Sequence, residues 1–412
     1  MSTAEQIFPW RSVVVSVFLP TLLFSIGEGA IIPVIPVVAG DLGAGLAGAG
    51  FIAAMILVGE LIGDIPAGAL VARIGERTAM IGAAALSIVG VLVSISAAQP
   101  WVLGLGIFLI GLATAVFALA RHAFMTSFVP IAYRARSLSS LGGTFRLGYL
   151  IGPFLTAALI QVSGDPIVAF WIHLVCCALA GLVLLFLRDP ESTLAARTVA
   201  GDLRAGEVEV AAESRGLFRT IYLNRRVLLT LGAGSSLVAA LRSSRFVILP
   251  LWAVSIGIDA TTTAIIIGVA AALDFALFYF GGWVMDRFGR LWTALPSMLG
   301  LAVGHLLLAF THDSPANVQW FIFVALLLSL ANGIGAGILM TLGADLADPQ
   351  YPAPFLGAWR FTNDFGGAVA PLLVAGITAV ASLALASGVM GVLGLLGAVI
   401  LRVYVPRYSK RP

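Results

Sequence analysis

Long runs of apolar residues, separated by short polar segments, follow one another along almost the whole chain. Each run has the roughly 20 residues that a helix needs to cross the hydrocarbon core of a bilayer. The pattern therefore predicts twelve transmembrane helices. The first six lie at 11–39, 47–71, 78–98, 101–129, 138–162 and 166–187, and the second six at 226–254, 261–285, 291–311, 317–346, 355–381 and 384–404.

Composition narrows the class of protein. Of the 412 residues, 60% are hydrophobic and only 10% are charged, whereas a soluble globular protein carries about 25% charged residues. This excludes a water-soluble enzyme and an intrinsically disordered chain. The two cysteines, Cys176 and Cys177, are adjacent within an apolar run, which excludes a disulfide scaffold. The basic residues are dispersed, so we expect no nucleic-acid partner.

The charged residues in the connections between spans are sorted by sign. Connections that follow even-numbered spans carry Arg73, Arg77, Arg134, Arg136, Arg287 and Arg290. Connections that follow odd-numbered spans carry Asp41, Asp165, Asp259 and Asp313, and neither Lys nor Arg. Lys and Arg accumulate in cytoplasmic loops. We therefore predict a multi-pass protein of the cell's inner (plasma) membrane with both termini in the cytoplasm.

The longest polar stretch divides the chain in two. It covers about 188–225 and carries charges of both signs, which is typical of a solvated linker. We predict an all-α membrane protein with an N-terminal six-helix bundle over 1–188, a cytoplasmic linker over 189–222 and a C-terminal six-helix bundle over 223–412. We expect it to be a monomer whose partners are the lipid bilayer and a small-molecule substrate.

Two motifs recur in the same order in both halves. G-A-L-V-A-R-I-G at 68–75 corresponds to G-W-V-M-D-R-F-G at 282–289, an offset of 214, and G-Y-L-I-G-P at 148–153 corresponds to G-G-A-V-A-P at 366–371, an offset of 218. This repetition indicates duplicated, pseudo-symmetric halves. Transporters built from repeated halves place the substrate site near the bilayer midplane, between the halves.

The first motif resembles the loop after helix 2 of the major facilitator superfamily, G-x-L-a-D-R-x-G-R. The second copy matches well, through Gly282, Asp286, Arg287, Gly289 and Arg290. The first copy keeps Gly68, Arg73, Gly75 and Arg77 but has Ala72 at the aspartate position. The resemblance implies the major facilitator fold, a gating role for these residues, and a weaker latch in the N-terminal half. At Gly68 and Gly282, the missing side chain favours close helix approach.

The second motif resembles the helix-5 antiporter signature of the same family, G-x-x-x-G-P-x-x-G-G. It is approximated by Gly148, Gly152 and Pro153, whereas Thr156 and Ala157 replace the last two glycines. The family's helix-4 arginine would fall near Ile107, which does not match it. This similarity to the drug:proton antiporter branch implies export. Physically, the glycines form a small-residue packing face followed by a kink point.

Ten charged residues lie within the predicted spans rather than at their ends or in the connections, five acidic and five basic. Each costs roughly 2.5–3.5 kcal/mol at the bilayer centre, so they should pair or line a wet cavity. The candidates for proton coupling are Glu28, Glu60, Asp64 and Asp274. The candidates for substrate or counter-ion binding are Arg242, Arg245, Arg121 and Arg146, and we assign Arg360 and Asp364 to gating.

Spacing suggests how some of these groups interact. Glu60 and Asp64 lie one helical turn apart, and two close carboxylates favour the binding of a proton. Arg360 and Asp364 share that spacing with opposite charges, which predicts an intrahelical ion pair. We expect Glu28, near mid-depth in the first span, to meet the central cavity. Arg121 and Arg146 have a second interpretation, a structural network with Asp64 or Glu60.

Arg242 and Arg245 stack two positive charges on one helix, which require carboxylates or an anionic substrate nearby. No spacing of His, Cys or carboxylates fits a metal site, and no phosphate-binding loop or nucleophile elbow occurs in a suitable context. We therefore predict a non-enzymatic secondary transporter without cofactors, driven by the proton gradient.

The preferred substrate is a small amphipathic or lipophilic compound that the protein exports. The alternatives are a proton-coupled uptake symporter for a small anionic metabolite and a lipid or lysolipid exporter. The identity of the substrate and the choice between proton and sodium coupling stay open at this stage.

Overall fold

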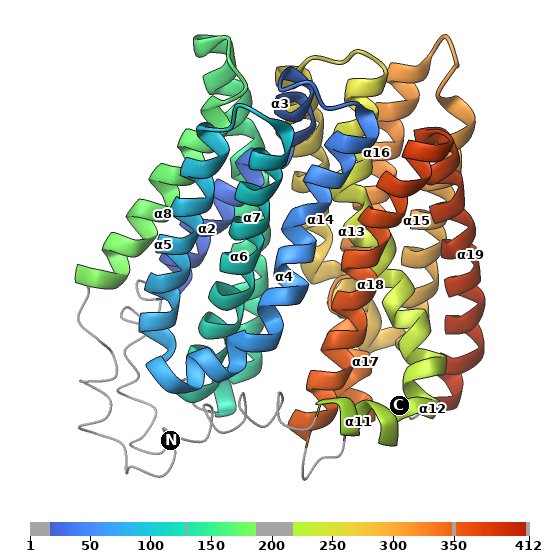
Figure 1. Cartoon of the computed structure of the whole chain (residues 1–412). Helices are drawn as coiled ribbons and strands as arrows, with labels where there is room; N and C mark the ends of the chain where they lie inside the picture. The colour runs from blue at the N-terminus through green and yellow to red at the C-terminus, as the bar shows by residue number, and fades with distance from the viewer. Residues whose placement is uncertain (1–16, 129–130, 187–216, 348–351, 409–412) are drawn as a thin grey trace.

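The computed structural model describes residues 17–128, 131–186, 217–347 and 352–408, and the regular elements in these ranges are helices. Eleven helices are long and apolar enough to cross a membrane, or twelve if one bent pair counts as a single span. They run side by side along one common direction (Figure 1). The predicted all-α multi-pass architecture is therefore confirmed.

The first span is the bent pair. It consists of α2 (Leu19–Ile31) and α3 (Ile35–Asp41), which meet at an angle of 46°. Pro33 and Pro36 lie at the break, and proline has no backbone N–H to continue a helix. The remaining helices of the N-terminal half are α4 (Leu46–Ile74), α5 (Glu76–Ile95), α6 (Pro100–Phe128), α7 (Ile131–Ser163) and α8 (Val168–Phe186).

Two spans of the C-terminal half are also irregular. The seventh joins α12 (Arg225–Val227), the π-helix η3 (Leu228–Gly232) and α13 (Ala233–Ser255), whereas the tenth breaks between α16 (Asn317–Ile334) and α17 (Ile338–Leu346). Gly337 at this break has a φ of 81°, which favours glycine. The other helices are α14 (Ala260–Phe288), α15 (Leu291–Thr311), α18 (Pro352–Val380) and α19 (Leu383–Tyr408).

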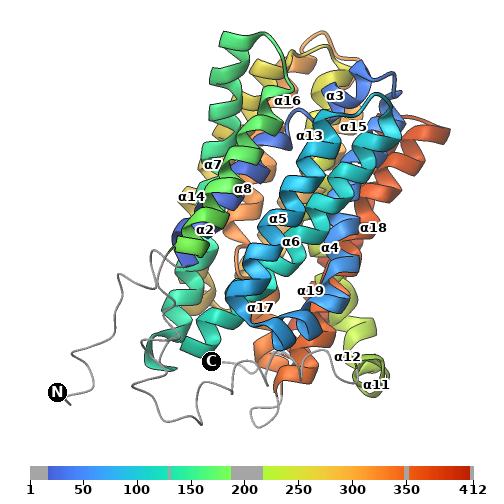
Figure 2. The ribbon, with the colours of Figure 1, turned by 60° about the vertical axis from the view of Figure 1, so that its left-hand side comes forward.

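Most of the predicted linker, 189–222, lies outside the described residues. Only its last part is described, as the start of the short helix α11 (Leu217–Leu223), which contacts α18. The helices before the linker, α2 and α4–α8, pack mainly on one another. After it, α13–α19 pack mainly on one another (Figures 1 and 2).

Two long seams join these groups of helices. One is formed by α7 and α14, and the other by α4 and α18. The bounds of α4 and α14 differ by 214 residues at both ends, which is the offset of the sequence repeat. In the repeat, α4 corresponds to α14 and α7 corresponds to α18. The α4–α18 seam and the α7–α14 seam are therefore related by the repeat, as expected for pseudo-symmetric halves.

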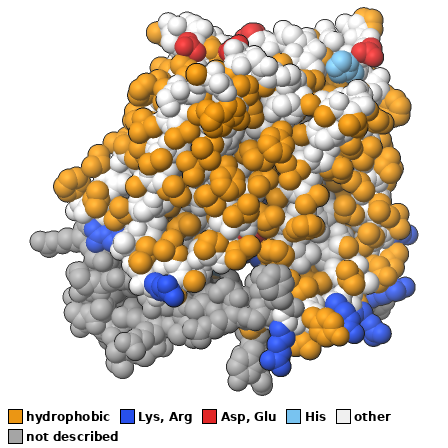
Figure 3. Space-filling model, in the orientation of Figure 1, with side chains coloured by type: hydrophobic (Ala, Val, Ile, Leu, Met, Phe, Trp, Pro, Cys, Tyr) orange, Lys and Arg blue, Asp and Glu red, His pale blue; other side chains and the backbone are white. Residues whose placement is uncertain are grey.

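The two ends of the molecule carry opposite charges (Figure 3). We call one the arginine end, because the helix ends that carry Arg73, Arg77, Arg287, Arg290 and Arg407 lie there (Figure 1). The other is the aspartate end, with Asp41, Asp165, Asp259 and Asp313. Between them lies a broad apolar belt of the height of the helices, which matches a bilayer environment.

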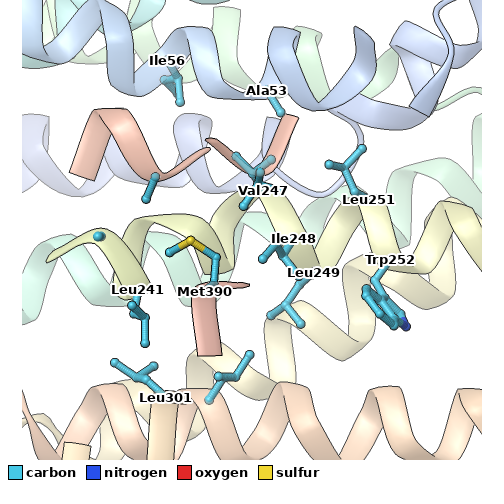
Figure 4. Packing of buried hydrophobic residues seen from close by; sticks show 14 of the residues in the cluster. Ala53, Ile56, Leu241, Val247, Ile248, Leu249, Leu251, Trp252, Leu301 and Met390 are labelled. Atoms are coloured by element: carbon cyan, nitrogen blue, oxygen red, sulfur yellow. The ribbon is translucent and has the colours of Figure 1, made fainter. Parts of the chain in front are cut away.

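Apolar packing closes the seam between the halves toward the aspartate end. Ala53 and Ile56 of α4 belong to one buried cluster with Val247 and Leu251 of α13 (Figure 4). The bent segment α3 also contacts α13. This side of the interface is therefore closed by apolar side chains.

Candidate substrate cavity and ion-pair networks

A cavity of about 220 Å³ lies between the two groups of helices, bordered by α2, α7, α13, α14 and α16. Its polar lining consists of Arg146, Tyr149, Arg242, Arg245, Asp274, Ser329 and Asn332. The apolar part of the lining includes Ile32, Phe145, Phe246, Leu249 and Ile267. Four of the ten charged residues predicted inside spans thus meet in one space.

Asp274 is the only carboxylate among the described residues that line the cavity. Its Oδ1 accepts a hydrogen bond of 2.9 Å from Asn332. Its Oδ2 lies 3.7 Å from Arg146 Nε and 3.9 Å from Arg245 Nη2. Both ion pairs are longer than a hydrogen bond, so Oδ2 is held by charge rather than by a direct bond.

The three guanidinium groups are only partly satisfied. Arg245 donates a hydrogen bond of 3.0 Å to Ser329, and Arg242 donates one to the Gly335 carbonyl. The Nε atoms of Arg146 and Arg242 have no hydrogen-bond partner among the described residues. Buried donors without partners cost free energy, so an acceptor that reached these Nε atoms would be favoured.

Aromatic rings support the arginines from the side. Arg146 stacks 4.4 Å from the ring of Phe278, and Arg245 lies 5.2 Å from that of Phe246. The ring of Tyr149 contacts those of Phe145 and Phe246. These cation–π contacts orient the two guanidinium groups.

The expectation that Glu28 meets the cavity is wrong. Glu28 is fully buried and is absent from the cavity lining. Its Oε1 lies 3.3 Å from Thr114 Oγ1, and Arg121 and Tyr149 interact with it electrostatically. Because α2 packs tightly against α7 at this depth, Tyr149 rather than Glu28 faces the cavity.

A second charged cluster lies at the seam between α4 and α18. Arg360 forms an ion pair of 2.9 Å with Asp64 across the seam and one of 3.4 Å with Asp364 on its own helix. The predicted intrahelical pair is confirmed. Glu60 interacts electrostatically with Arg360 and both aspartates. The alternative that Arg146 pairs with Asp64 or Glu60 is wrong, because its partner is Asp274.

The structure also differs from the second interpretation of Arg121, which placed it in a structural network with Asp64 or Glu60. Among carboxylates its strongest interaction is with Glu28, and that with Glu60 is weaker. Its guanidinium lies 5.0 Å from the ring of Phe145. Arg121 therefore belongs to the Glu28 site within the N-terminal half rather than to an ion pair with Asp64.

The second copy of the loop motif makes its strongest contacts within the C-terminal half. Arg290 binds Asp345 through two hydrogen bonds, of 2.9 and 3.2 Å, and lies 4.0 Å from the exposed Asp286. Gly289 has a φ of 95°, so glycine is favoured at this turn. Sequence reasoning missed Asp345, which follows a break in its span and matches no motif.

One glycine of this copy does not behave as expected. A side chain at Gly282 would meet nothing within 4 Å, whereas one at Gly281 would lie 2.4 Å from the Ile334 carbonyl. The expectation of close helix approach at Gly282 is therefore wrong. The neighbouring residue makes the contact, because the rotation of α14 turns Gly281 toward α16.

The first copy bonds to a different helix. Arg77 donates to the carbonyls of Leu184 and Leu185 at the end of α8, at 2.8 and 3.2 Å. Gly75 has a φ of 78°, Gly68 is buried and Arg73 is exposed. The gating role of both copies stays a prediction.

The glycines of the antiporter-like motif bring two helices together. A Cβ atom at Gly148 would lie 2.4 Å from that of Ser25, and one at Gly152 would lie 2.5 Å from the backbone of Ala30. The predicted small-residue packing face is confirmed, and its partner is α2. Pro153 lines the cavity.

Three polar residues of the cavity escaped sequence reasoning. Tyr149, Ser329 and Asn332 carry no charge, so their presence in apolar spans was not conspicuous. Asn332 has the clearest signal, since it lies between small residues on α16. In the part of the chain that the structure describes, no group of three His, Cys, Asp or Glu could hold a metal.

A family model described as Major Facilitator Superfamily matches residues 17–350 and 231–412. The chain belongs to the Major Facilitator Superfamily. It is accordingly a membrane transporter and not an enzyme, in agreement with the expectation from its loop motif. The drug:proton antiporter branch stays a prediction. No curated protein matches the chain by sequence.

Solved transporter structures share this fold over nearly the whole chain. A peptide transporter POT in complex with sulfate has a TM-score of 0.76 at 14% identity, covering 97% of this chain and 95% of that one. A POT family transporter in complex with 5-aminolevulinic acid has a TM-score of 0.74 at 14% identity, with 97% of both chains covered. The xylose transporter XylE from E. coli, inward open, has a TM-score of 0.73 at 15% identity, again covering 97% of both.

Proposed function

We propose that this superfamily member is a proton-coupled secondary transporter that binds a small organic anion in the cavity between its halves. The observation that carries the proposal is the cavity's charge, three guanidinium groups against one carboxylate. An uncompensated charge at this depth is costly, and an anionic substrate would balance it. The aromatic and aliphatic lining suits an apolar body attached to the anionic group.

The transport cycle follows from the position of the cavity. A site between repeated halves is exposed alternately to each side as the bundles rock against one another. The apolar packing toward the aspartate end, together with an ion pair toward the arginine end, supports a state in which the aspartate side is closed. Opening toward the aspartate end would break apolar contacts, whereas opening toward the arginine end would separate the charges of Asp64 and Arg360.

The orientation in the membrane rests on the charge of the two ends. We assign the arginine end to the cytoplasm, because Lys and Arg are retained on that side during insertion. Both termini are then cytoplasmic, and the protein resides in the cell's inner (plasma) membrane.

A second function, export of an amphipathic or lipophilic compound, is supported by different observations. Most of the cavity lining is apolar, and the close packing at Gly148 and Gly152 fits the antiporter-like motif. A lipid or lysolipid exporter is a variant of this candidate. Export of such a compound leaves the excess of guanidinium groups in the cavity without a role. We therefore rank this second function below the binding of an anion.

A pair of probes that differ only in charge distinguishes the two functions. We propose to measure the thermal unfolding of the full-length protein in detergent with benzenesulfonate, a permanent anion, and with benzenesulfonamide, its neutral analogue. Binding should add about 2.7 kcal/mol of stability at about 100 times Kd. We expect this for the sulfonate alone.

The Arg242→Gln variant should lose most of the response to benzenesulfonate, because it removes a cavity guanidinium. Arg402→Gln, which changes an exposed arginine of α19, serves as the matched control and should keep it. Equal stabilisation by both probes would contradict the anion site and favour the lipophilic substrate.

A further inference from the structure

The numbers of positive and negative groups in the central cavity are unequal, which bears on the charge of the substrate, an inference that rests on the proposed function. Arg146, Arg242 and Arg245 line the cavity together with one carboxylate, Asp274. Arginine stays protonated in proteins, so with Asp274 ionised three positive charges face one negative charge. The described lining therefore has an excess of two positive charges.

The other carboxylates within the spans are engaged elsewhere. Asp274 is the carboxylate that attracts all three arginines of the cavity. Glu28 is attracted to Arg121 within the N-terminal half, and these two opposite charges balance each other. The carboxylates of the α4–α18 seam gather around Arg360. The excess in the cavity is therefore left for a ligand to balance.

The excess is distributed over two positions in the cavity. Arg146 Nε and Arg245 Nη2 share one oxygen of Asp274, at 3.7 and 3.9 Å, so two positive groups are attracted to a single negative one. Arg242 donates instead to the neutral carbonyl of Gly335. One unbalanced charge thus lies at the Arg146–Arg245 pair and the other at Arg242, and the pair joins α7 of one half to α13 of the other.

We propose that the substrate is a dianion, whose two negative charges are held by the Arg146–Arg245 pair and by Arg242. Three positive charges then face three negative charges, counting Asp274, and the loaded cavity is neutral. A monoanion leaves one positive charge unbalanced within the membrane, which is costly.

The chemistry of the lining indicates which dianions fit. Guanidinium groups bind carboxylate, sulfonate and phosphate oxygens through charge-assisted hydrogen bonds. Phe145, Phe246 and Leu249 supply apolar surface beside the arginines, which suits a ring or a short hydrocarbon body. Dicarboxylates, disulfonates and phosphate monoesters share this chemistry. They differ in whether the two charges lie on separate groups or on one.

The first test compares two permanent anions that share a ring and differ in charge. The dissociation constants of benzene-1,3-disulfonate and benzenesulfonate are measured at constant ionic strength, from the ligand dependence of thermal unfolding of the full-length protein in detergent. We expect the disulfonate to bind at least about tenfold more tightly, because its second sulfonate forms further charge-assisted bonds.

Phenyl phosphate distinguishes one doubly charged group from two separate ones. It loses its second proton at about pH 6, so it is mainly a monoanion at about pH 5 and a dianion at about pH 8. Tighter binding at the higher pH, with the affinity for benzenesulfonate as the pH control, assigns both charges to one phosphate. Stronger preference for the disulfonate assigns them to separate groups.

Variants that change the cavity charge in opposite directions test the cause. Ser329, which accepts a hydrogen bond from Arg245, is changed to Asp or to Asn, two side chains of similar shape that differ in charge. Ser329→Asp should reduce the preference for the disulfonate relative to Ser329→Asn, because the added carboxylate balances one arginine. Asp274→Asn removes the carboxylate, so the preference should rise above that of the wild type.

The outcomes separate this proposal from the proposed function. Equal affinity for benzenesulfonate and for both dianions would overturn the dianion but leave the anion site. A preference that does not change in Asp274→Asn, or that is equal in the two Ser329 variants, would place the second charge outside the cavity and also overturn the proposal. Absence of binding of all three probes to the wild type would overturn the anion site itself.

Discussion

A single carboxylate outside the membrane shows how much one residue contributes to a helix end. Asp259 precedes α14, and its Oδ1 accepts a 2.9 Å hydrogen bond from the Thr262 N–H. The hydrogen bonds from Thr262 hold the pKa of the Asp259 carboxyl below its usual value. The equivalent residue of the first half, 214 positions earlier, is Gly45, which caps α4 without a side chain.

We predict that Asp259→Ala lowers stability by about 1 kcal/mol at neutral pH, the usual loss for an N-cap. The wild-type advantage should shrink as pH falls below the ordinary carboxyl range, because a carboxyl with a lowered pKa loses its stabilising effect on protonation. Thermal unfolding in detergent at several pH values checks this. Asp41→Ala is the control, and an equal loss for both variants would contradict the cap.

At the level of whole helices, close approach depends on a few glycines whose partner helix is visible only in the packing. Gly148 and Gly152 of α7 lie against the backbone of α2. By contrast, a side chain at Gly376 of α18 would meet nothing within 4 Å. The G-x-x-x-G spacing distinguishes Gly148 and Gly152 in the sequence, whereas Gly376 has no glycine four residues away.

We predict opposite effects of alanine at these two kinds of position. Gly152→Ala should destabilise the protein by about 1–3 kcal/mol, since the added methyl group would clash with backbone that has no room to move. Gly376→Ala should be neutral or gain up to about 1 kcal/mol from helix propensity. Thermal unfolding in detergent compares them. Equal midpoints for the two variants would refute the tight contact between α7 and α2.

At the scale of the whole molecule, the two seams are related by the repeat but differ in chemistry. On one seam Asp64 pairs with Arg360. The equivalent positions of the other seam, offset by 214 and 218 residues, are Phe278 and Gly142, where a Cβ atom would lie 3.4 Å from the phenyl ring. At this depth the α4–α18 seam is thus ionic and the α7–α14 seam apolar. The Arg146–Asp274 pair of the α7–α14 seam lies one helical turn nearer the aspartate end.

We predict that the α4–α18 seam, which holds the Asp64–Arg360 pair, is the one that opens toward the arginine end. Asp64→Asn removes a charge from the pair, so the separation of α4 from α18 should increase by at least about 2 Å. The separation of α7 from α14 should stay unchanged. Spin labels at the arginine ends of each helix pair measure both distances. Equal widening of the two seams would contradict a division of labour between them.

Sequence alone determined the positions of the spans, the repeated order of the motifs in the two halves, and the family. Each of these rests on local information. Membrane insertion requires about 20 apolar residues in a row, and the loop motif is read within nine positions. The ten charged residues predicted within spans all lie in helices of the described chain. Even the pair formed by Arg360 and Asp364 followed from helical spacing.

The tertiary structure decided which of these charges meet. Asp64 and Arg360 lie 296 positions apart, and Asp274 draws its arginines from two other helices. Such contacts depend on how each helix is rotated and where its neighbours lie, which no local pattern specifies. For the same reason the depth of Glu28 could be predicted but its direction could not, since a small rotation of α2 separates the cavity from the Arg121 site.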